Sequence, residues 1–233
     1  MFSVIFEVFP KPECFDEYLA IAKHLKPILE SIDGFVDNER FESRRRLGWI
    51  LSHSTWRDEK SAIRWPTNGE HHAMKEKGRG EILRDYHLRV GDVTADTHAP
   101  SGAPVREQRF DETETGAAKF ATFTEIMPRE KAFDGDPLSA LAFDPSQGGV
   151  IGHDVFASIY NPGKIALLVS WKDADAAKQW TPKKAEHTQS LRHRMVRVVR
   201  DYGMFDRREA PPFYPDLPEH GTKQGDGKPN AAA

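Results

Sequence analysis

Cysteine pairs, a charge excess and long apolar runs are all missing from this sequence. Cys14 is the only cysteine among 233 residues, so no disulfide can form within one chain. The chain has 33 lysines and arginines and 36 aspartates and glutamates. Because these charges nearly balance, the protein has no strong positive electrostatic field that would bind a nucleic acid. No apolar run approaches the roughly 20 residues that cross a bilayer, and the opening "MFSVIFEVF" lacks the basic leader of a signal peptide. We therefore expect a cytoplasmic protein that binds a small molecule and associates with neither nucleic acid nor membrane.

Several catalytic motifs are absent as well. The sequence has no glycine-rich phosphate loop, no GxSxG elbow, no HExxH pair and no cysteine pair for zinc. These absences set aside the common nucleotide-binding, serine-hydrolase and zinc-dependent chemistries.

The chain contains an internal duplication. "SVIFEVFP" (3–10) resembles "ATFTEIMP" (121–128), with an offset of 118. Further along, an offset of 115 holds for a phenylalanine, two tryptophans and a histidine: Phe41/Phe156, Trp56/Trp171, Trp65/Trp180 and His72/His187. Matches at a constant offset indicate a repeated structural unit. Near the end, "LRVGDV" (88–93) aligns best with "RMVRVV" (194–199).

The first copy predicts the element order β-α-β-β-α-β. Residues 2–9 alternate as a strand does, and apolar residues from Phe15 to Ile32 recur at helical steps up to a stop at Gly34. "GFVDNERFES" and "LGWILSHSTW" predict two strands, "RDEKSAIRW" a short helix, and "YHLRVGDV" the last strand. This order is the ferredoxin-like unit, in which helices cover one face of a four-stranded sheet.

The second copy repeats this order with a weaker first helix, broken by Pro137 and Pro145. Each sheet leaves one face bare, and two bare faces in one chain can close on each other. We therefore predict the α+β class, with two ferredoxin-like βαββαβ repeats forming an intramolecular dimeric α+β barrel, as a monomeric pseudo-dimer or as a homodimer. Repeat 1 spans 1–95, a linker 96–117 and repeat 2 118–208, and the proline- and glycine-rich segment 209–233 is expected to be a disordered tail.

The stretch "WPTNGEHHAM" (65–74) concentrates candidate site residues. Pro66 is expected to end one helix, and Thr67 with Glu70 forms a capping box that starts the next. This arrangement aims His72 at the space beside Trp65, and we interpret His71 as the solvated histidine. An imidazole in this position could ligate a metal or transfer a proton, or it could simply bond a backbone carbonyl.

These features resemble the antibiotic biosynthesis monooxygenase superfamily of dimeric α+β barrels, which includes the IsdG-type haem-degrading monooxygenases. The resemblance covers residues 1–95 and about 118–209. It rests on "VIFEVFP", "IDGFVDNERFES", the spacing of Trp56, Trp65 and His72, and "VVRDYGMFDRREAP". It implies the barrel fold and an oxygenase that acts on a flat hydrophobic substrate.

Similarity to the haem-degrading branch implies haem as a cofactor. In that branch a helix histidine is the axial iron ligand, and a preceding tryptophan distorts the macrocycle. By position these are His72 and Trp65 here, with His187 and Trp180 as their counterparts in the second repeat.

The sequence departs from that branch in two respects. The branch carries an asparagine on the first strand, where this chain has Val8 and Ile126, and its tryptophan-to-histidine gap is longer. A distal hydrogen bond to oxygen would therefore be missing or come from another residue.

Two strand residues are further candidates. His53 shares a face with Leu51 and Thr55, from which it could act as an acid or base in a cavity or remain a satisfied buried histidine. Glu7 recurs as Glu125 among apolar neighbours, where burial would raise the carboxyl pKa and suit a base. A position at the rim of the barrel is the alternative for both carboxylates.

Three functions remain open, because a fold alone does not define a reaction. The leading expectation is a haem-degrading monooxygenase with His72 on the iron. The second is a cofactor-free monooxygenase of quinols or aromatic polyketides, in which Trp65, His53 and His72 bind and deprotonate the substrate. The third is a non-enzymatic small-molecule-binding or stress protein.

Overall fold

The computed structural model describes residues 1–103, 105–129, 136–183 and 188–211. The first repeat contains β1 (Phe2–Pro10), η1 (Pro12–Cys14), α1 (Phe15–Glu30), β2 (Phe35–Ser43), β3 (Ile50–Trp56), α2 (Glu59–Thr67), α3 (Gly69–Lys77), η2 (Gly78–Ile82) and β4 (Leu83–Asp96). The second contains β5 (Phe120–Pro128), α4 (Pro137–Ala140), β6 (Val150–Ser158), β7 (Ile165–Trp171), α5 (Ala174–Lys178) and β8 (Thr188–Gly203).

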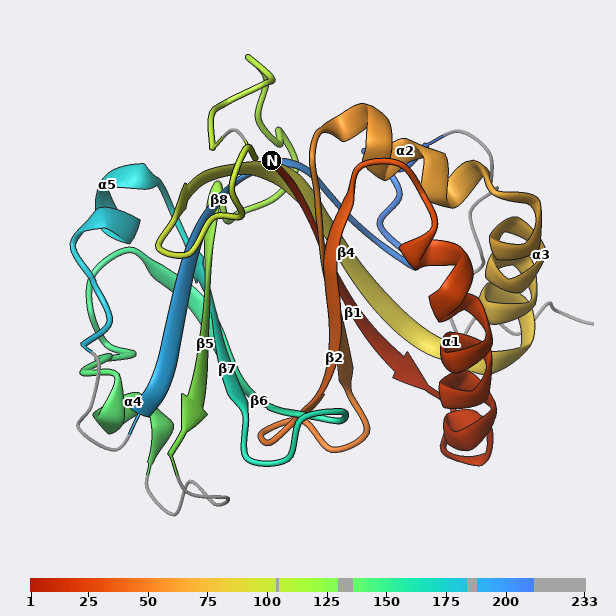
Figure 1. The fold of residues 1–233 in the computed structure, drawn as a ribbon, viewed down its shortest axis with the longest axis horizontal. Helices are drawn as coiled ribbons and strands as arrows, with labels where there is room; N and C mark the ends of the chain where they lie inside the picture. The colour runs from red at the N-terminus through yellow and green to blue at the C-terminus, as the bar shows by residue number, and fades with distance from the viewer. Residues whose placement is uncertain (104, 130–135, 184–187, 212–233) are drawn as a thin grey trace, which may run out of the picture.

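The strands form a closed barrel in the order β1-β3-β2-β6-β7-β5-β8-β4 (Figure 1). Each repeat contributes four neighbouring strands, in the orders β2-β3-β1-β4 and β6-β7-β5-β8, which is the ferredoxin-like arrangement. The halves join where β2 meets β6 and along the long strands β4 and β8. The predicted α+β class and the intramolecular barrel of two ferredoxin-like repeats are confirmed.

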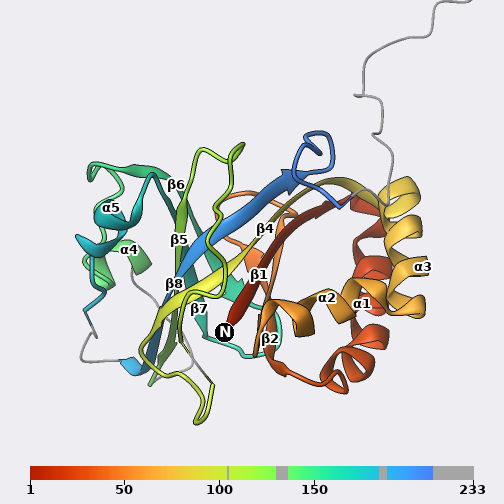
Figure 2. The ribbon, with the colours of Figure 1, turned by 90° about the horizontal axis from the view of Figure 1, so that it is seen from above.

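The helices lie outside the barrel and differ between the repeats (Figures 1 and 2). The first sheet is covered by α1, α2 and α3, whereas the described part of the second carries only the short α4 and α5. Gly34 follows α1 with φ +88°, and a Cβ there would lie 2.1 Å from Ser61 Oγ. None of the described helices is long and apolar enough to span a membrane.

The lumen of the barrel is a core shared by both repeats. Its buried apolar cluster consists of Ile5, Phe41, Leu51, Ala121, Phe123, Phe156, Ala166, Leu168 and Val198. Phe41 and Phe123, one from each repeat, meet edge to face with centroids 5.6 Å apart. Neither sheet alone removes this apolar surface from water, so the lumen stabilises the chain only when both repeats are present.

The strand pairings correct the predicted alignment of β4 with β8. Phe2 pairs with Asp92, and its counterpart Phe120 pairs with Arg197. The offset between these two strands is therefore 105, and the predicted match of "LRVGDV" with "RMVRVV" was wrong by one residue. Under the correct register, Arg89 corresponds to Arg194.

This register reveals a buried ion-pair network in each repeat. In the first, Glu7 pairs with Arg89 and Arg46, and Arg46 also reaches Asp154 of the second repeat at 2.7 Å. In the second, Glu125 pairs with Arg194 at 2.6 Å and with Lys164 at 2.5 Å, and Lys164 also reaches Glu39 of the first repeat. Each network therefore ties its own first strand to a carboxylate of the other repeat.

The environment of Glu7 contradicts the expectation of a raised pKa. Burial alone would raise the pKa of this carboxyl, but the Arg89 and Arg46 guanidiniums and His87 together hold the pKa below its usual value. The lowered pKa makes the Glu7 carboxylate a weaker base than an ordinary glutamate and suits its part in a structural ion-pair network.

The segment between the repeats packs on the barrel. It runs irregularly from the end of β4 to β5, and the backbone N–H groups of Gln108 and Arg109 donate to Asp92 Oδ2 at 3.0 Å each. Arg109 also pairs with Glu59 at the start of α2. Most of the expected tail, from 212 onward, lies outside the described residues.

A fragment of residues 1–95 should not persist as a soluble monomer. Without the second repeat, the lumen side chains Ile5, Phe41 and Leu51 lose their apolar partners and face water. We expect the fragment to dimerise or aggregate in light-scattering measurements, while the full chain stays soluble under the same conditions. A stable monomeric fragment would contradict the mutual dependence of the two sheets.

Candidate functional site between sheet and helices

Several apolar residues between the first sheet and its helices remain partly exposed. Val4, Phe6, Leu88 and Val90 point from the sheet toward α1 and α2, yet they are only half-buried. Ser52, in the same layer on β3, is also half-buried. Residues in the middle of a covered sheet are normally sealed from solvent. Solvent therefore reaches the apolar floor beneath the helices of repeat 1.

The start of α3 positions the histidine pair over this space. Asn68, and not the expected Thr67, is the N-cap, and its side-chain oxygen accepts from the backbone N–H groups of Glu70 and His71. Thr67 Oγ1 instead bonds carbonyls of α2. The predicted capping box was wrong by one residue. With Asn68 as the N-cap, the histidines that follow lie at other angles about the helix axis than the prediction assumed.

His71, and not His72, lies against Trp65. The imidazole stacks on the indole with centroids 3.9 Å apart and an interplanar angle of 11°. The Nδ1 atom lies 3.0 Å from the Trp65 carbonyl oxygen. A carbonyl can only accept, so Nδ1 carries the proton and Nε2 keeps a lone pair. Among the described residues, Nε2 has no hydrogen-bond partner.

Electrostatics keep His71 neutral. Burial lowers the pKa of His71 to about 4, and the positive charges of Lys75 and Arg40 act in the same direction. The hydrogen bond to Trp65 opposes this shift only in part. At neutral pH the free Nε2 is therefore a hydrogen-bond acceptor.

His72 occupies a more exposed position. Its side chain is 45% exposed, and Nε2 lies 3.8 Å from Glu76 one turn further along α3. The interpretation of His71 as the solvated histidine was wrong. A usable signal was the apolar Met74 three residues after His71, since residues at i and i+3 share a helix face.

Polar residues of β2 and α1 line the same layer. Arg40 Nη1 donates to Asn38 Oδ1 and to Tyr160 Oη, each at 3.4 Å. Asn38 in turn donates to Ser52 Oγ at 3.2 Å. Burial raises the pKa of the Tyr18 phenol, and the neighbouring Arg40 guanidinium opposes this shift. Sequence reasoning missed Arg40, Asn38 and Tyr18 because nothing in their local pattern distinguishes them from ordinary surface residues.

The equivalent space in the second repeat is filled by aromatic side chains. Trp180 is 5% exposed, packs on Phe143 at 5.1 Å between centroids, and donates through Nε1 to Ala142 O. Thr124, the counterpart of Phe6, is fully buried and bonds His193. Trp180 is therefore part of a packed core, and His187 lies outside the described residues.

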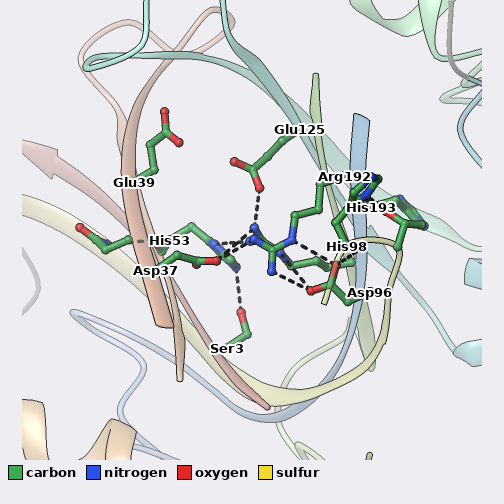
Figure 3. Close-up of polar contacts among 12 residues, drawn as sticks. Ser3, Asp37, Glu39, His53, Asp96, His98, Glu125, Arg192 and His193 are labelled. Atoms are coloured by element: carbon green, nitrogen blue, oxygen red, sulfur yellow. Dashed lines mark hydrogen bonds and ion pairs between the residues drawn. The ribbon is translucent and has the colours of Figure 1, made fainter. Parts of the chain in front are cut away.

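His53 faces the lumen (Figure 3), whereas Trp65 packs against the cluster on the outer face of the sheet. Its Nδ1 accepts from Arg194 Nη1 at 2.9 Å, so Nε2 is protonated and donates to Ser3 Oγ at 2.9 Å. Burial holds the pKa of His53 well below its usual value, and Arg194 adds to this effect. Both ring nitrogens are engaged, which leaves His53 no free atom for proton transfer.

A pocket of about 290 Å³ opens at this end of the lumen. Its wall includes Asp37, His53, Glu125, Arg192 and Arg194, and its charged groups pair with one another (Figure 3). A lining of this kind does not suit a flat hydrophobic molecule.

The expected grouping of Trp65, His53 and His72 in one site is not formed. Successive residues of a strand point to opposite faces, so His53 is directed into the lumen while Trp65 lies over the outer face. On the outer face, His71 stacks on Trp65, and Arg40 contacts Asn38 and Tyr18. The positive charge of Arg40 also acts to lower the pKa of His71.

The barrel and its two ferredoxin-like repeats agree with comparisons to known proteins. Residues 1–77 match the family model described as "Antibiotic biosynthesis monooxygenase". A jasmonate monooxygenase of Pyricularia oryzae is 42% identical over 220 residues, which cover 92% of this chain and 99% of that protein. The chain belongs to the antibiotic biosynthesis monooxygenase family and is a monooxygenase of that type.

Solved structures are more distant. An aldoxime dehydratase crystallised with butyraldoxime aligns with a TM-score of 0.54 at 12% identity, over 85% of this chain and 79% of that one. A solved antibiotic biosynthesis monooxygenase aligns with a TM-score of 0.37 at 17% identity, over 41% of this chain and all of that one. The first of these likenesses supports the fold alone.

Proposed function

We propose that this protein is a cofactor-free monooxygenase that oxidises a small hydrophobic carbonyl compound beneath the helices of repeat 1. The proposal rests on the neutral imidazole of His71. Its Nδ1–H donates to the Trp65 carbonyl oxygen, and its Nε2 lone pair has no hydrogen-bond partner among the described residues. This acceptor is fixed in position beside the partly exposed apolar floor and is unprotonated at neutral pH, as a deprotonating group must be, although a pKa of about 4 makes it a weak base.

The chemistry follows from this acceptor. His71 Nε2 accepts a proton from a carbon next to the substrate carbonyl, and the resulting enolate adds O₂ and regains the proton as a hydroperoxide. Loss of water then leaves a new carbonyl, so that R₂CH₂ and O₂ give R₂C=O and H₂O without an external reductant. Trp65 holds the imidazole plane by stacking.

The relative from Pyricularia oryzae supports this substrate class. It is called a jasmonate monooxygenase, and it aligns with this chain over nearly its whole length. Jasmonate is a small cyclic ketone that carries a carboxylate, and it therefore has acidic carbon-bound hydrogens beside a carbonyl. We propose jasmonate or a closely similar ketone acid as the substrate.

Haem fits this site less well than the leading expectation required. The expected ligand His72 is 45% exposed and lies near Glu76, and the expected distorting residue Trp65 is covered on one face by His71. A macrocycle ligated by His72 would need both side chains to move. We therefore propose that no haem takes part in the reaction.

Turnover in labelled oxygen tests the proposal. The purified chain, treated with a chelator and supplied with jasmonate and ¹⁸O₂, should give a product that carries one ¹⁸O atom by mass spectrometry. A haemin titration of the same preparation should give no Soret band that depends on either histidine. Absence of any oxygenated product, or a Soret band that His71→Ala or His72→Ala abolishes, would reject the cofactor-free proposal.

A further inference from the structure

Arg40 is a buried cation that pairs with no carboxylate of the described residues. The side chains of Arg89, Arg194 and Arg197 are equally buried, and each pairs with a carboxylate. Arg40 is 8% exposed, and among the described residues no carboxylate lies within 4.0 Å of it. Its guanidinium contacts neutral groups, namely the oxygens of Asn38 and Tyr160 at 3.4 Å and the phenol of Tyr18. Burying an uncompensated charge costs stability, so the fold alone gives no reason to retain it.

The guanidinium belongs to the same layer as the proposed site. Arg40 pairs with Ser52 across β2 and β3, which sets its side chain on the outer face of the sheet. The positive charge of Arg40 acts to lower the pKa of Tyr18 on α1 and the pKa of His71 on α3. Arg40 therefore lies beneath the helices, in the layer that holds the Trp65 and His71 rings.

The second repeat provides an internal comparison. At the offset of 115, Val155 stands in place of Arg40 and Leu167 in place of Ser52. Both are buried in the closed apolar cluster of that repeat. The same strand position thus accepts an apolar residue where the space is filled, and it carries a cation only where the space is open.

We propose that Arg40 binds the carboxylate of the substrate, which makes this protein selective for small hydrophobic acids in their anionic form. The inference rests on the proposed function and names the group that the site recognises. A guanidinium can hold a carboxylate through two parallel hydrogen bonds, and the Tyr160 hydroxyl at 3.4 Å supplies a further donor. Tyr160 comes from the second repeat, so the neighbouring half of the barrel contributes to the site of the first.

This arrangement orients the substrate. With its carboxylate at Arg40, the apolar body lies along Phe6 and Leu88 of the half-buried floor, and its carbonyl end extends toward His71. Arg40 is thus a binding and specificity-determining residue, and His71 performs the proton transfer.

The experiment compares jasmonate with its methyl ester on the full chain, in wild type, Arg40→Met and Arg40→Lys. Binding is measured by calorimetry without oxygen, and turnover separately with oxygen. Wild type should bind the acid roughly 10- to 100-fold more tightly than the ester, as expected for hydrogen bonds to a charged group. Arg40→Met should lose this preference while its ester affinity changes little, and Arg40→Lys should keep part of the preference. Arg44→Gln, which alters an exposed arginine beyond the end of the same strand, is the matched control and should behave as wild type.

Each outcome separates the inference from the proposed function. An unchanged acid-to-ester ratio in Arg40→Met, or no anaerobic binding of the acid by wild type, overturns the role of Arg40 whatever the turnover. Acid binding that depends on Arg40 without oxygenated product rejects the proposed reaction and retains the anion site. The thermal midpoint of Arg40→Met should equal or exceed that of wild type, because an uncompensated charge is removed. A clear fall in that midpoint would show that Arg40 stabilises the fold and would also overturn the inference.

Discussion

Replacing Glu7 by leucine should destabilise the barrel by about 3–5 kcal/mol, because it leaves a buried guanidinium without its partner. Glu7 is the carboxylate that pairs with Arg89, whose side chain is only 4% exposed. Arg46 would keep Asp154, but the Arg89 Nη1 bond to Ser170 does not compensate a full charge. Urea unfolding followed by circular dichroism at pH 7 measures the change. A loss below 1 kcal/mol would show that water reaches Arg89 in spite of its burial.

The double variant Glu7→Leu/Arg89→Met distinguishes this cause from a general packing defect. With both charges gone, no uncompensated ion remains, and most of the lost stability should return. Arg57→Ala serves as the surface comparison, since Arg57 forms its bridge to Asp33 in an exposed position. Exposed bridges contribute little, so this variant should lose less than about 1 kcal/mol.

His71→Phe should lower kcat by roughly 100- to 10,000-fold, the range that positioned proton transfer contributes. Phenylalanine keeps the aromatic stack on Trp65 and removes the Nε2 acceptor, so the change isolates the chemistry from the packing. The assay is oxygenated product from jasmonate at saturating substrate, with circular dichroism to verify the fold.

His72→Ala is the control, because this neighbouring side chain is 45% exposed and is not stacked on Trp65. It should keep kcat within a factor of about 3, as expected for a residue outside the site. Should the losses be reversed, with His72→Ala inactive and His71→Phe active, the assignment of the acceptor to His71 would be abandoned.

The sequence was sufficient to predict the barrel, because the patterns that indicate it extend over many residues. Paired residues such as Trp56 and Trp171 repeat at a constant offset, and each repeat shows a helix or strand period over many residues. Errors of one position do not matter to such patterns. The closed eight-stranded topology followed from two bare sheet faces in one chain.

The site depended on single positions, and there the sequence was ambiguous. A shift of one residue in the capping signal, from Thr67 to Asn68, changes which of His71 and His72 faces Trp65. A shift of one residue between β4 and β8 exchanges the two faces of a strand and concealed the equivalence of Arg89 with Arg194. The role proposed for Arg40 could not be predicted from the sequence, since an arginine on a strand is unremarkable until the three-dimensional structure shows that no carboxylate of the described residues pairs with it.

In the second repeat, aromatic side chains fill the space that corresponds to the proposed site. This difference between the repeats affects how the reaction rate depends on substrate concentration. Two identical subunits around one barrel would offer two equal sites that could communicate through the shared lumen. Here Trp180 and Phe143 occupy the second position, and Val155 replaces the cation. Under the proposed function we therefore expect one ligand per chain. The rate should rise with substrate concentration along a simple hyperbola, with a Hill coefficient of about 1, because cooperativity requires at least two sites.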